Sequence, residues 1–439
     1  MKLNKISIKN YRCFDKLDIS LNDHLTLLVG RNGAGKSTIL DAIAVAISTF
    51  LCGIEGAVSR NIQKEDARYK FYELDGIIDP QHQFPVVITG VGECDGKINI
   101  EWTRELNSIS GKTTVKEARQ LIEIADKMQA QLMEGNAEVV LPILSYYGTG
   151  RLYAQKKEKR DLKTLQKFNR QVGYLDCMDA ESNEKMMLNW FEKMTLKSLQ
   201  NQQKTGLTEK IPQSKVVEEV ICKCFRRISG YKESTMFFDL DTHRIIVEYS
   251  DGERKCRFAL NEMSDGYKNT LSMIGDIAYR MSVLNPQLGE SVLESTPGIV
   301  LIDEIDLHLH PEWQQTILKD LQEIFPKVQF VVTSHAPAVI NSVQKEQIRI
   351  LDNGQIYMPA EQTYGRDANS ILREVMQVGE RPENVQQLLT DFYNAIDEEK
   401  VEEAESLLNQ IAEIVGDTDP EISGARVTLQ FEKMRGEWT

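Results

Sequence analysis

A run of residues near the start of the chain has the types and spacing that bind phosphate. It consists of Gly30, Arg31, Asn32, Gly33, Ala34, Gly35, Lys36 and Ser37, in the order G-x-x-x-x-G-K-S. Glycines let the backbone curl so that successive N–H groups point at the phosphates of a nucleotide. The lysine would reach the β- and γ-phosphates, and the serine hydroxyl would hold a magnesium ion. The alternative is a glycine-rich turn that matches the pattern by chance.

The segments on either side of this loop favour the phosphate-binding interpretation. Residues 25–29 form a short apolar run of strand length, and residues from Thr38 to Ile47 have the composition and periodicity of a helix. The N-terminus of such a helix adds its dipole to the N–H groups of the loop. Strand, loop and helix follow one another in the required order, so the sequence predicts binding of a nucleoside triphosphate with Mg²⁺.

A second apolar strand pattern ends in two carboxylates. Residues 299–302 are branched and apolar, and Asp303 and Glu304 follow them directly. Ligands of open α/β sheets bind at the carboxyl ends of the strands, where these two side chains are expected. Asp303 is suited to hold the magnesium through water, and Glu304 to polarise the attacking water as a general base. The alternative is a solvated strand edge.

A third strand pattern, residues 330–333, ends in Ser334 and His335. A strand-terminal histidine is more often structural, but beside the other two motifs we expect it to hydrogen-bond the γ-phosphate and report its presence. His308 and His310 lie in the loop after the carboxylates. Metal ligation is one interpretation of this pair, and a loop that packs against a partner subunit is the favoured one.

Between the loop and the carboxylates, Ser264, Asp265 and Gly266 precede a helical pattern that begins at Thr270 and ends near Val283. A Ser-x-Gly turn that opens a helix provides another N-terminus able to bind phosphate. Any helix can start in this way, so the position of this turn between the two other motifs makes it informative.

Taken together, the motifs resemble the ABC-type ATPase head of the SMC, RecF and overcoming-lysogenisation-defect group. Residues 8–14 are similar to the I-x-N-[FY]-[RK]-x-[FY] start of that group, in which the basic residue, here Arg12, helps to hold phosphate. Ser264 and Gly266 stand where the signature motif stands, with Asp265 in place of the commoner glycine. The resemblance implies that this motif closes in trans over the γ-phosphate of another subunit, in a head-to-tail homodimer or a higher even oligomer.

The same resemblance assigns further loops. Residues 309–311 match the D-loop region, and His335 matches the switch histidine. The glutamine of the Q-loop is not placed, since residues 146–151 occupy that region and Gln155 is one candidate.

The predicted fold class is α/β: a P-loop ATPase head with a parallel core sheet and an antiparallel β lobe. Residues 1–151 form its N-terminal half, 152–235 an inserted helical lobe, and 236–355 its C-terminal half with the signature motif, carboxylates and switch histidine. The lobe has no sustained heptads, so no coiled-coil arm is expected. Residues 356–439 form a C-terminal helical region, with two amphipathic helices within 383–416 and a short tail after them. Partner or self-association and a solvated appendix are both open interpretations of this region.

The composition bounds the class of protein. The chain has 439 residues, of which 41% are hydrophobic and 27% charged, as expected for a soluble protein of two or three domains. No apolar stretch stands out as long enough to cross a bilayer and no signal peptide is evident, so we expect a cytoplasmic protein without a membrane partner. The seven cysteines lack a framework spacing, which fits reduced thiols. Cys222 and Cys224 form a C-x-C pair, for which idle thiols are favoured over a zinc site.

The net charge of −14 argues against a protein covered in DNA-binding surface, because polyanions are bound through clustered Lys and Arg. The basic run within residues 156–170 is the best local candidate for a nucleic-acid contact, although a solvated helix face is the commoner explanation. Nucleic acid is therefore expected mainly through a partner.

The C-terminal part of the chain carries a second, shorter resemblance. Residues 363–372 and 380–382 look like the corresponding region of PtuA-type ATPases from Septu and retron-associated antiphage systems. This resemblance implies an HNH-type nuclease partner encoded beside the ATPase, and it allows a retron reverse transcriptase with its RNA and DNA. The sequence leaves no room for a Toprim-type domain, so no intrinsic nuclease is expected.

The leading hypothesis is therefore an ATP-hydrolysing regulatory subunit that gates a separate nuclease in phage defence through dimerisation of its heads. The alternative is a RecF- or SMC-like ATPase that binds DNA in repair or recombination. The acidic balance and the missing coiled coil weigh against that alternative. An ATPase subunit of a membrane transporter is disfavoured by the I-x-N-Y-R start and by the long insert.

Overall fold

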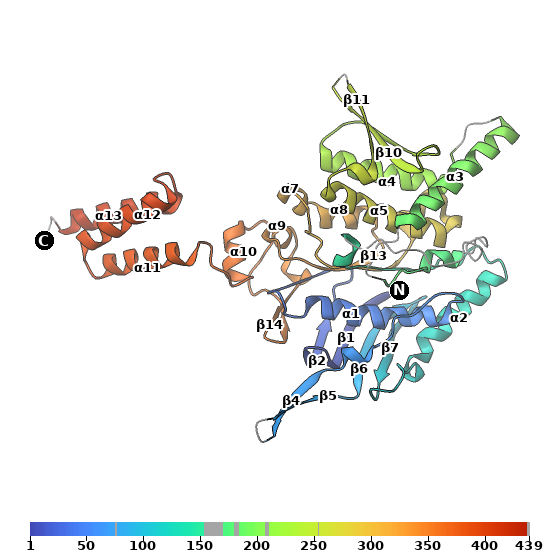
Figure 1. Ribbon diagram of the computed structural model, residues 1–439, viewed down its shortest axis with the longest axis horizontal. Coiled ribbons are helices and arrows are strands. Elements are labelled where there is room, and N and C mark those ends of the chain that lie inside the picture. Colours follow the sequence, from blue (N-terminus) through green and yellow to red (C-terminus); the bar gives the residue numbers. More distant parts are fainter. Residues whose placement is uncertain (75–76, 153–169, 180–183, 207–209, 253, 437–439) are drawn as a thin grey trace. The chain divides into compact units, whose positions relative to one another are not determined.

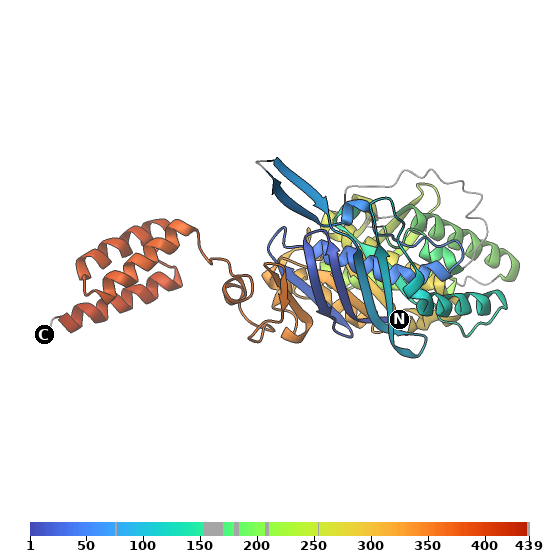
Figure 2. The ribbon, with the colours of Figure 1, turned by 90° about the horizontal axis from the view of Figure 1, so that it is seen from below.

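We describe a computed structural model of the chain (Figures 1 and 2). It describes residues 1–439 with the exception of 75–76, 153–169, 180–183, 207–209, 253 and 437–439. The chain forms two compact units, Met1–Arg366 and Asp367–Thr439, which we describe one at a time.

The first unit is organised around a six-stranded sheet with the strand order β15-β14-β3-β13-β12-β8. The strands are β3 (Leu25–Gly30), β8 (Ile143–Tyr147), β12 (Gly298–Ile302), β13 (Val328–Thr333), β14 (Ile348–Asp352) and β15 (Gln355–Tyr357). All neighbours pair in parallel except β15, which pairs antiparallel at the edge. Every residue of β8, β12 and β13 is buried, which explains their continuous apolar runs. The strands that precede the three predicted motifs, β3, β12 and β13, lie next to each other and end at the same edge.

Helices cover both faces of this sheet. Figure 1 shows α1 (Lys36–Ile47) on one side and α4 (Pro212–Ser229), α5 (Asp265–Leu284) and α8 (Ile317–Ile324) on the other. Helix α1 packs against the core sheet and also against an antiparallel sheet, so that all residues from Ile39 to Ile47 are buried. A helix that is enclosed on all sides must be apolar on all sides.

This enclosure corrects one expectation from the sequence. The segment Lys36–Gly53 is long and apolar enough, by length and composition, to cross a membrane, and 89% of it is buried inside the protein. The expectation that no stretch has this composition was therefore wrong. The reason is that a core helix between two sheets needs the same all-round apolar surface as a membrane span.

The antiparallel sheet has the strand order β2-β1-β6-β7. Its strands are β1 (Lys2–Tyr11), β2 (Phe14–Ser20), β6 (Val86–Cys94) and β7 (Lys97–Leu106). A hairpin of β4 (Tyr69–Leu74) and β5 (Ile77–His82) forms a separate two-stranded sheet, which projects from the unit in Figure 2. The short turn between β1 and β2 carries Arg12 and Cys13 towards the loop that follows β3.

Two segments between strands of the core sheet contribute further helices and a small sheet. Helix α2 (Arg119–Met133) precedes β8. Helices α3 (Glu184–Thr205) and α4 follow β8, as do the strands β9 (Ser234–Asp239), β10 (Arg244–Asp251) and β11 (Arg254–Ala259). Short helices follow at α6 (Val292–Ser295), α7 (Pro311–Gln314) and α9 (Pro337–Ile340).

The predicted basic run falls largely outside the described residues, as does the Q-loop candidate Gln155. The described end of that run, Arg170, does not belong to a free basic patch. Its guanidinium donates hydrogen bonds to the carbonyl oxygens of Leu284 and Val139, at 2.6 Å each, and it therefore has a structural role.

The second unit consists of α10 (Ala368–Glu374), α11 (Glu383–Asp397), α12 (Val401–Val415) and α13 (Pro420–Gly436). The last three helices share one apolar core, which includes Leu389, Phe392, Leu408, Ile411 and Leu429. The prediction of a short tail after Gly416 was wrong, because the helix α13 forms there. Its apolar residues lie on two faces of the helix, so they do not produce the single stripe that marks an amphipathic helix.

Gly298 provides a test of the strand register. Gly298 is the first residue of β12. A Cβ atom added to it would lie 1.9 Å from the carbonyl oxygen of Ile143 on β8. We expect Gly298→Ala to lower the free energy of unfolding by about 3 kcal/mol, since the neighbouring backbone must shift.

The matched control is Gly56→Ala. Gly56 has a φ of 78° but no heavy atom within 4 Å of an added Cβ, so it carries backbone strain without the clash. We expect a cost of about 1–2 kcal/mol there. Denaturant unfolding measures the free energy of unfolding of both variants. An equal loss in the two variants would contradict the register of β12 against β8.

Candidate functional site

The carboxyl ends of β3, β12 and β13 open on a cleft of about 300 Å³. It is lined by Cys13, Asn32, Gly33, Gly35, Lys36, Ser37, Thr38, Asp303, Glu304 and His335. Residues from three predicted motifs, distant in the sequence, thus surround one space. A larger cavity of about 590 Å³ lies elsewhere and contains none of the motif residues, so volume alone does not locate the site.

The loop between β3 and α1 requires its glycines for two physical reasons. Gly33 and Gly35 have φ angles of 80° and 105°, in the left-handed region that favours glycine. A Cβ on Gly35 would also lie 2.6 Å from the ring of Phe14 and 2.8 Å from Sγ of Cys13. The β1–β2 turn therefore rests directly on the loop, and Cys13 is a lining residue that the sequence analysis did not single out.

Lys36 is held by the loop that it belongs to. Its Nζ donates hydrogen bonds to the carbonyl oxygens of Gly30 at 2.9 Å and Arg31 at 3.1 Å. The N–H of Ala34 donates to the same Arg31 carbonyl and closes the turn. Burial lowers the pKa of Lys36, and the nearby carboxylates, Asp303 foremost, oppose that shift. The ammonium group is thus fixed at the cleft beside the residues expected to hold Mg²⁺.

A threonine hydroxyl connects the two acidic residues with the neighbouring strand. Thr333, the last residue of β13, donates to Oδ1 of Asp303 at 2.6 Å and accepts from the backbone N–H of Glu304 at 2.7 Å. Asp303 is 4% exposed, and its N–H donates to the carbonyl of Tyr147 on β8 at 2.8 Å. Glu304 has a φ of 49°, which turns the chain sharply after the strand. The sequence analysis missed Thr333, whose only signal is its place directly before Ser334 and His335.

His335 lies on the same cleft. Burial lowers its pKa, the Lys36 ammonium lowers it further, and Asp306 and Asp303 act in the opposite direction. The imidazole is therefore mainly neutral at pH 7 and can donate one hydrogen bond from one nitrogen while accepting one at the other.

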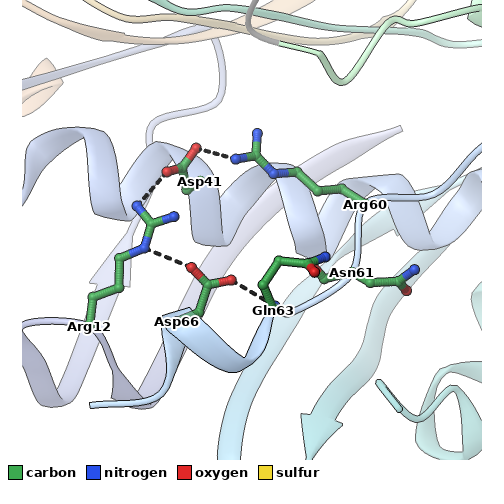
Figure 3. Close-up of polar contacts among 6 residues, drawn as sticks. All are labelled: Arg12, Asp41, Arg60, Asn61, Gln63 and Asp66. Carbon is green, nitrogen blue, oxygen red and sulfur yellow. Dashed lines mark hydrogen bonds and ion pairs between the residues drawn. The ribbon is translucent and has the colours of Figure 1, made fainter. Parts of the chain in front are cut away.

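Arg12 occupies an ion-pair network beside the cleft (Figure 3). Its Nε donates to Oδ1 of Asp66 at 2.8 Å, and its Nη1 to Oδ2 of Asp41 at 2.5 Å. Asp41 also accepts from Arg60 at 2.7 Å, and Asp66 from the backbone N–H of Gln63 at 2.8 Å. Arg12 does not line the cleft itself, whereas the next residue along the chain does.

The network fixes the β1–β2 turn to the helix of the phosphate-binding loop, because Asp41 lies on α1 five positions after Lys36. The sequence analysis missed Asp41 and Asp66. Asp41 had a signal, since it is the single carboxylate in an otherwise apolar helix. Asp66 had none, because only the folded chain brings it to Arg12.

Ser264 and Gly266 do not line the cleft of their own chain. Ser264 is the exposed N-cap of α5, and its hydroxyl makes no capping hydrogen bond. A Cβ on Gly266 would lie 2.6 Å from the carbonyl oxygen of His308, so this turn touches the loop that follows the carboxylates. In a single chain, the predicted signature turn therefore does not line the cleft of the glycine-rich loop.

The remaining metal candidates have simpler explanations in the described part of the chain. Nδ1 of His310 accepts from the N–H of Glu312 and caps α7. Cys222 and Cys224 are both buried on α4. Among the described residues, no group of three or more His, Cys, Asp or Glu side chains could hold a metal ion.

Several known proteins resemble this chain in sequence. The family model described as "AAA domain" matches residues 5–219, and a second AAA-domain model matches residues 195–341. The chain is 27% identical to a protein named as a probable ATPase of retron Vc95 from Vibrio cholerae, over 87% of this chain and 80% of that protein. It is also 27% identical to the probable ATPase of retron Ec83 from Escherichia coli, over 99% of this chain and 87% of that protein. The Septu protein PtuA of Bacillus thuringiensis is 22% identical over 91% of this chain and 90% of its own length.

The two AAA-domain matches together span residues 5–341, and with the parallel core sheet they confirm the predicted α/β P-loop ATPase fold.

Asp41→Asn tests whether the network supports the nucleotide site. The substitution removes the charge that holds both Arg12 and Arg60, and we expect it to weaken ATP binding about tenfold, as is typical when a supporting residue behind a ligand site is lost. The measurement is a titration with a fluorescent ATP analogue. The matched control is Asp18→Asn, an exposed acid on β2 that pairs with Ser7 and Lys5, and it should leave the affinity unchanged. Equal affinities for the two variants would show that the network has no role in binding.

Proposed function

We propose that this ABC-type ATPase hydrolyses ATP between two copies of its head and thereby gates a separate HNH-type nuclease in phage defence. The observation that carries the hydrolysis step is the convergence of Lys36, Ser37, Asp303, Glu304 and His335 on one cleft. Each of these residue types has a distinct task in phosphoryl transfer. The proposal assigns those tasks as follows.

Lys36 binds the β- and γ-phosphates, for which it exchanges its hydrogen bonds to the loop carbonyls. The Ser37 hydroxyl and the Asp303 carboxylate hold Mg²⁺, with Asp303 acting through water. Oxygen donors of this kind suit a hard cation, and Thr333 keeps the carboxylate oriented. When bound, the ion neutralises charge on the phosphate oxygens.

Glu304 accepts a proton from the attacking water, and His335 contacts the γ-phosphate. Glu304 is suited to the task because its backbone is fixed through Thr333 while its side chain lines the cleft. A neutral His335 can donate a hydrogen bond to a phosphate oxygen without adding a charge that competes with Lys36.

The signature turn explains why ATP hydrolysis requires a second copy of the head. Ser264 and Gly266 do not line the cleft of their own chain, and the exposed N-terminus of α5 can bind the γ-phosphate held by another head. Two heads then close around ATP and reopen after hydrolysis, because the γ-phosphate that bridges them is lost. Arg12 assists from the β1–β2 turn, where two carboxylates set its position.

The HNH-type nuclease partner follows from the resemblance of residues 363–372 and 380–382 to PtuA-type ATPases, and the named relatives support the defence setting. Two of them are named as probable ATPases of retrons and one as a Septu protein, and the chain aligns with them over most of its length. We therefore assign the nuclease to a separate cytoplasmic subunit and place any contact with a retron reverse transcriptase, RNA or DNA in the assembled complex.

Glu304→Gln tests the hydrolysis mechanism. The amide cannot accept the proton, so we expect kcat to fall by about 100-fold or more while ATP binding is retained. The variant should also accumulate as an ATP-bound dimer, because the step that reopens the heads is blocked. The control is Glu312→Gln, an exposed carboxylate of α7 that does not line the cleft. If Glu304→Gln hydrolysed ATP at the wild-type rate, the assignment of the base would be wrong.

The mass of the protein expressed with the product of its neighbouring gene, with and without ATP, tests the proposed biological role. A nuclease complex that ATP remodels supports gating. The contrary result is a dimer without a nuclease that binds DNA only in the presence of ATP, with an affinity that falls steeply as the salt concentration rises. That result would contradict gating and support a role in DNA repair.

A further inference from the structure

Helix α13 is apolar on two opposite faces. Ile422, Ala425 and Leu429 point into the core that it shares with α11 and α12, where each is at most 6% exposed. On the far side, Val427, Phe431 and Met434 are 53%, 67% and 51% exposed. Their spacing of four and then three residues places them on one side of the helix, in a row that we call the α13 stripe.

The α13 stripe has the pattern by which helices recognise partners. Apolar residues at i, i+4 and i+7 form the anchors of helix-in-groove complexes. Phenylalanine and methionine are also enriched in the centres of protein interfaces. The three-helix core already uses the other face of α13, so the stripe adds nothing to the stability of its own unit. Within residues 367–439, the stripe stays exposed.

The charge of the second unit indicates the chemistry of that molecule. Residues 367–439 contain 17 Asp and Glu but six Lys and Arg, a net charge of −11 out of −14 for the whole chain. The acids are concentrated and exposed around the α11–α12 turn, at Asp397, Glu398, Glu399, Glu402, Glu403 and Glu405.

Two cations on α13 form ion pairs within the second unit. Arg426 pairs with Asp417, and Lys433 pairs with Glu405 at 2.6 Å. The second unit as a whole keeps an excess of negative charge. Two copies of this unit would bring like charges together, which disfavours a homotypic contact, whereas a positively charged protein surface would be attracted.

We propose that the α13 stripe, with the acids of the second unit around it, docks on a cationic surface of the partner nuclease. This inference rests on the proposed function. A nuclease must bind a polyanion, so the face that receives its substrate is rich in Lys and Arg. The acidic second unit is complementary in charge to such a face, and the α13 stripe supplies an apolar anchor. Docking of the unit there would exclude nucleic acid from that face.

The experiment uses the full chain co-expressed with the HNH nuclease encoded beside it, and it measures the apparent Kd of the complex. We expect Phe431→Ser with Met434→Ser to weaken the complex by at least about 30-fold, the effect of losing a central apolar anchor. The matched control is Phe71→Ser, a 68% exposed phenylalanine on the β4–β5 hairpin, and it should leave the affinity unchanged. ATP hydrolysis should persist in all variants, because none of these residues lines the cleft.

A charge variant tests the second half of the inference. Glu399→Gln, Glu402→Gln and Glu403→Gln together should weaken the complex about tenfold at low salt, and the difference from wild type should shrink as salt screens the charges. Nucleic acid should compete with the wild-type chain for the nuclease.

The outcomes separate the inference from the proposed function. If the wild-type chain formed no complex with the nuclease, the proposed function itself would fail, and this inference with it. A wild-type complex that survives the α13 substitutions, or that Phe71→Ser disrupts equally, would overturn the inference alone. So would dissociation of the ATPase oligomer by the α13 substitutions in the absence of nuclease, since that result would make the stripe a contact between copies.

Discussion

The site depends on the gapless parallel pairing of β12 with β13 and of β13 with β3. Since parallel strands in register end at one edge, this pairing alone brings the glycine-rich loop, the two acids and His335 together. The hydroxyl of Thr333 then fixes the relation between the strands more finely, as it contacts both Asp303 and the backbone of Glu304. A shift of one strand by one residue relative to its neighbour would displace a carboxylate by about 3.3 Å. Such a displacement exceeds the misplacement of a reacting group that phosphoryl transfer tolerates.

The antiparallel lobe contributes to the site through one turn. Cys13 and Phe14 lie against Gly35, and Arg12 is held by Asp41 on the helix that begins at Lys36. These contacts join the β1–β2 turn to the start and to the middle of α1. The antiparallel lobe and the glycine-rich loop are therefore coupled through direct contacts. A conformational change in the loop would move the β1–β2 turn and the two strands that it joins.

The sequence predicted the parts of the site that are local. The loop at Gly30–Ser37 and the pair Asp303 and Glu304 are recognisable because each motif is complete within a few residues of one strand. Thr333 and Asp66 could not be recognised, because their roles arise from contacts with segments far away in the sequence. The sequence also predicted helices in the second unit but missed α13, since apolar residues on two faces erase the periodicity on which that prediction depends.

The uneven distribution of charge has a consequence for the whole chain. The net charge of −14 counted against contact with nucleic acid, yet residues 1–366 account for only −3 of it, with 49 acidic and 46 basic residues. The isoelectric point of about 5.1 is thus an average over two bodies, one nearly neutral and one strongly acidic. The acidity of the whole chain comes mainly from the unit without the candidate site. The low net charge of residues 1–366 imposes no large electrostatic barrier between that unit and a polyanion.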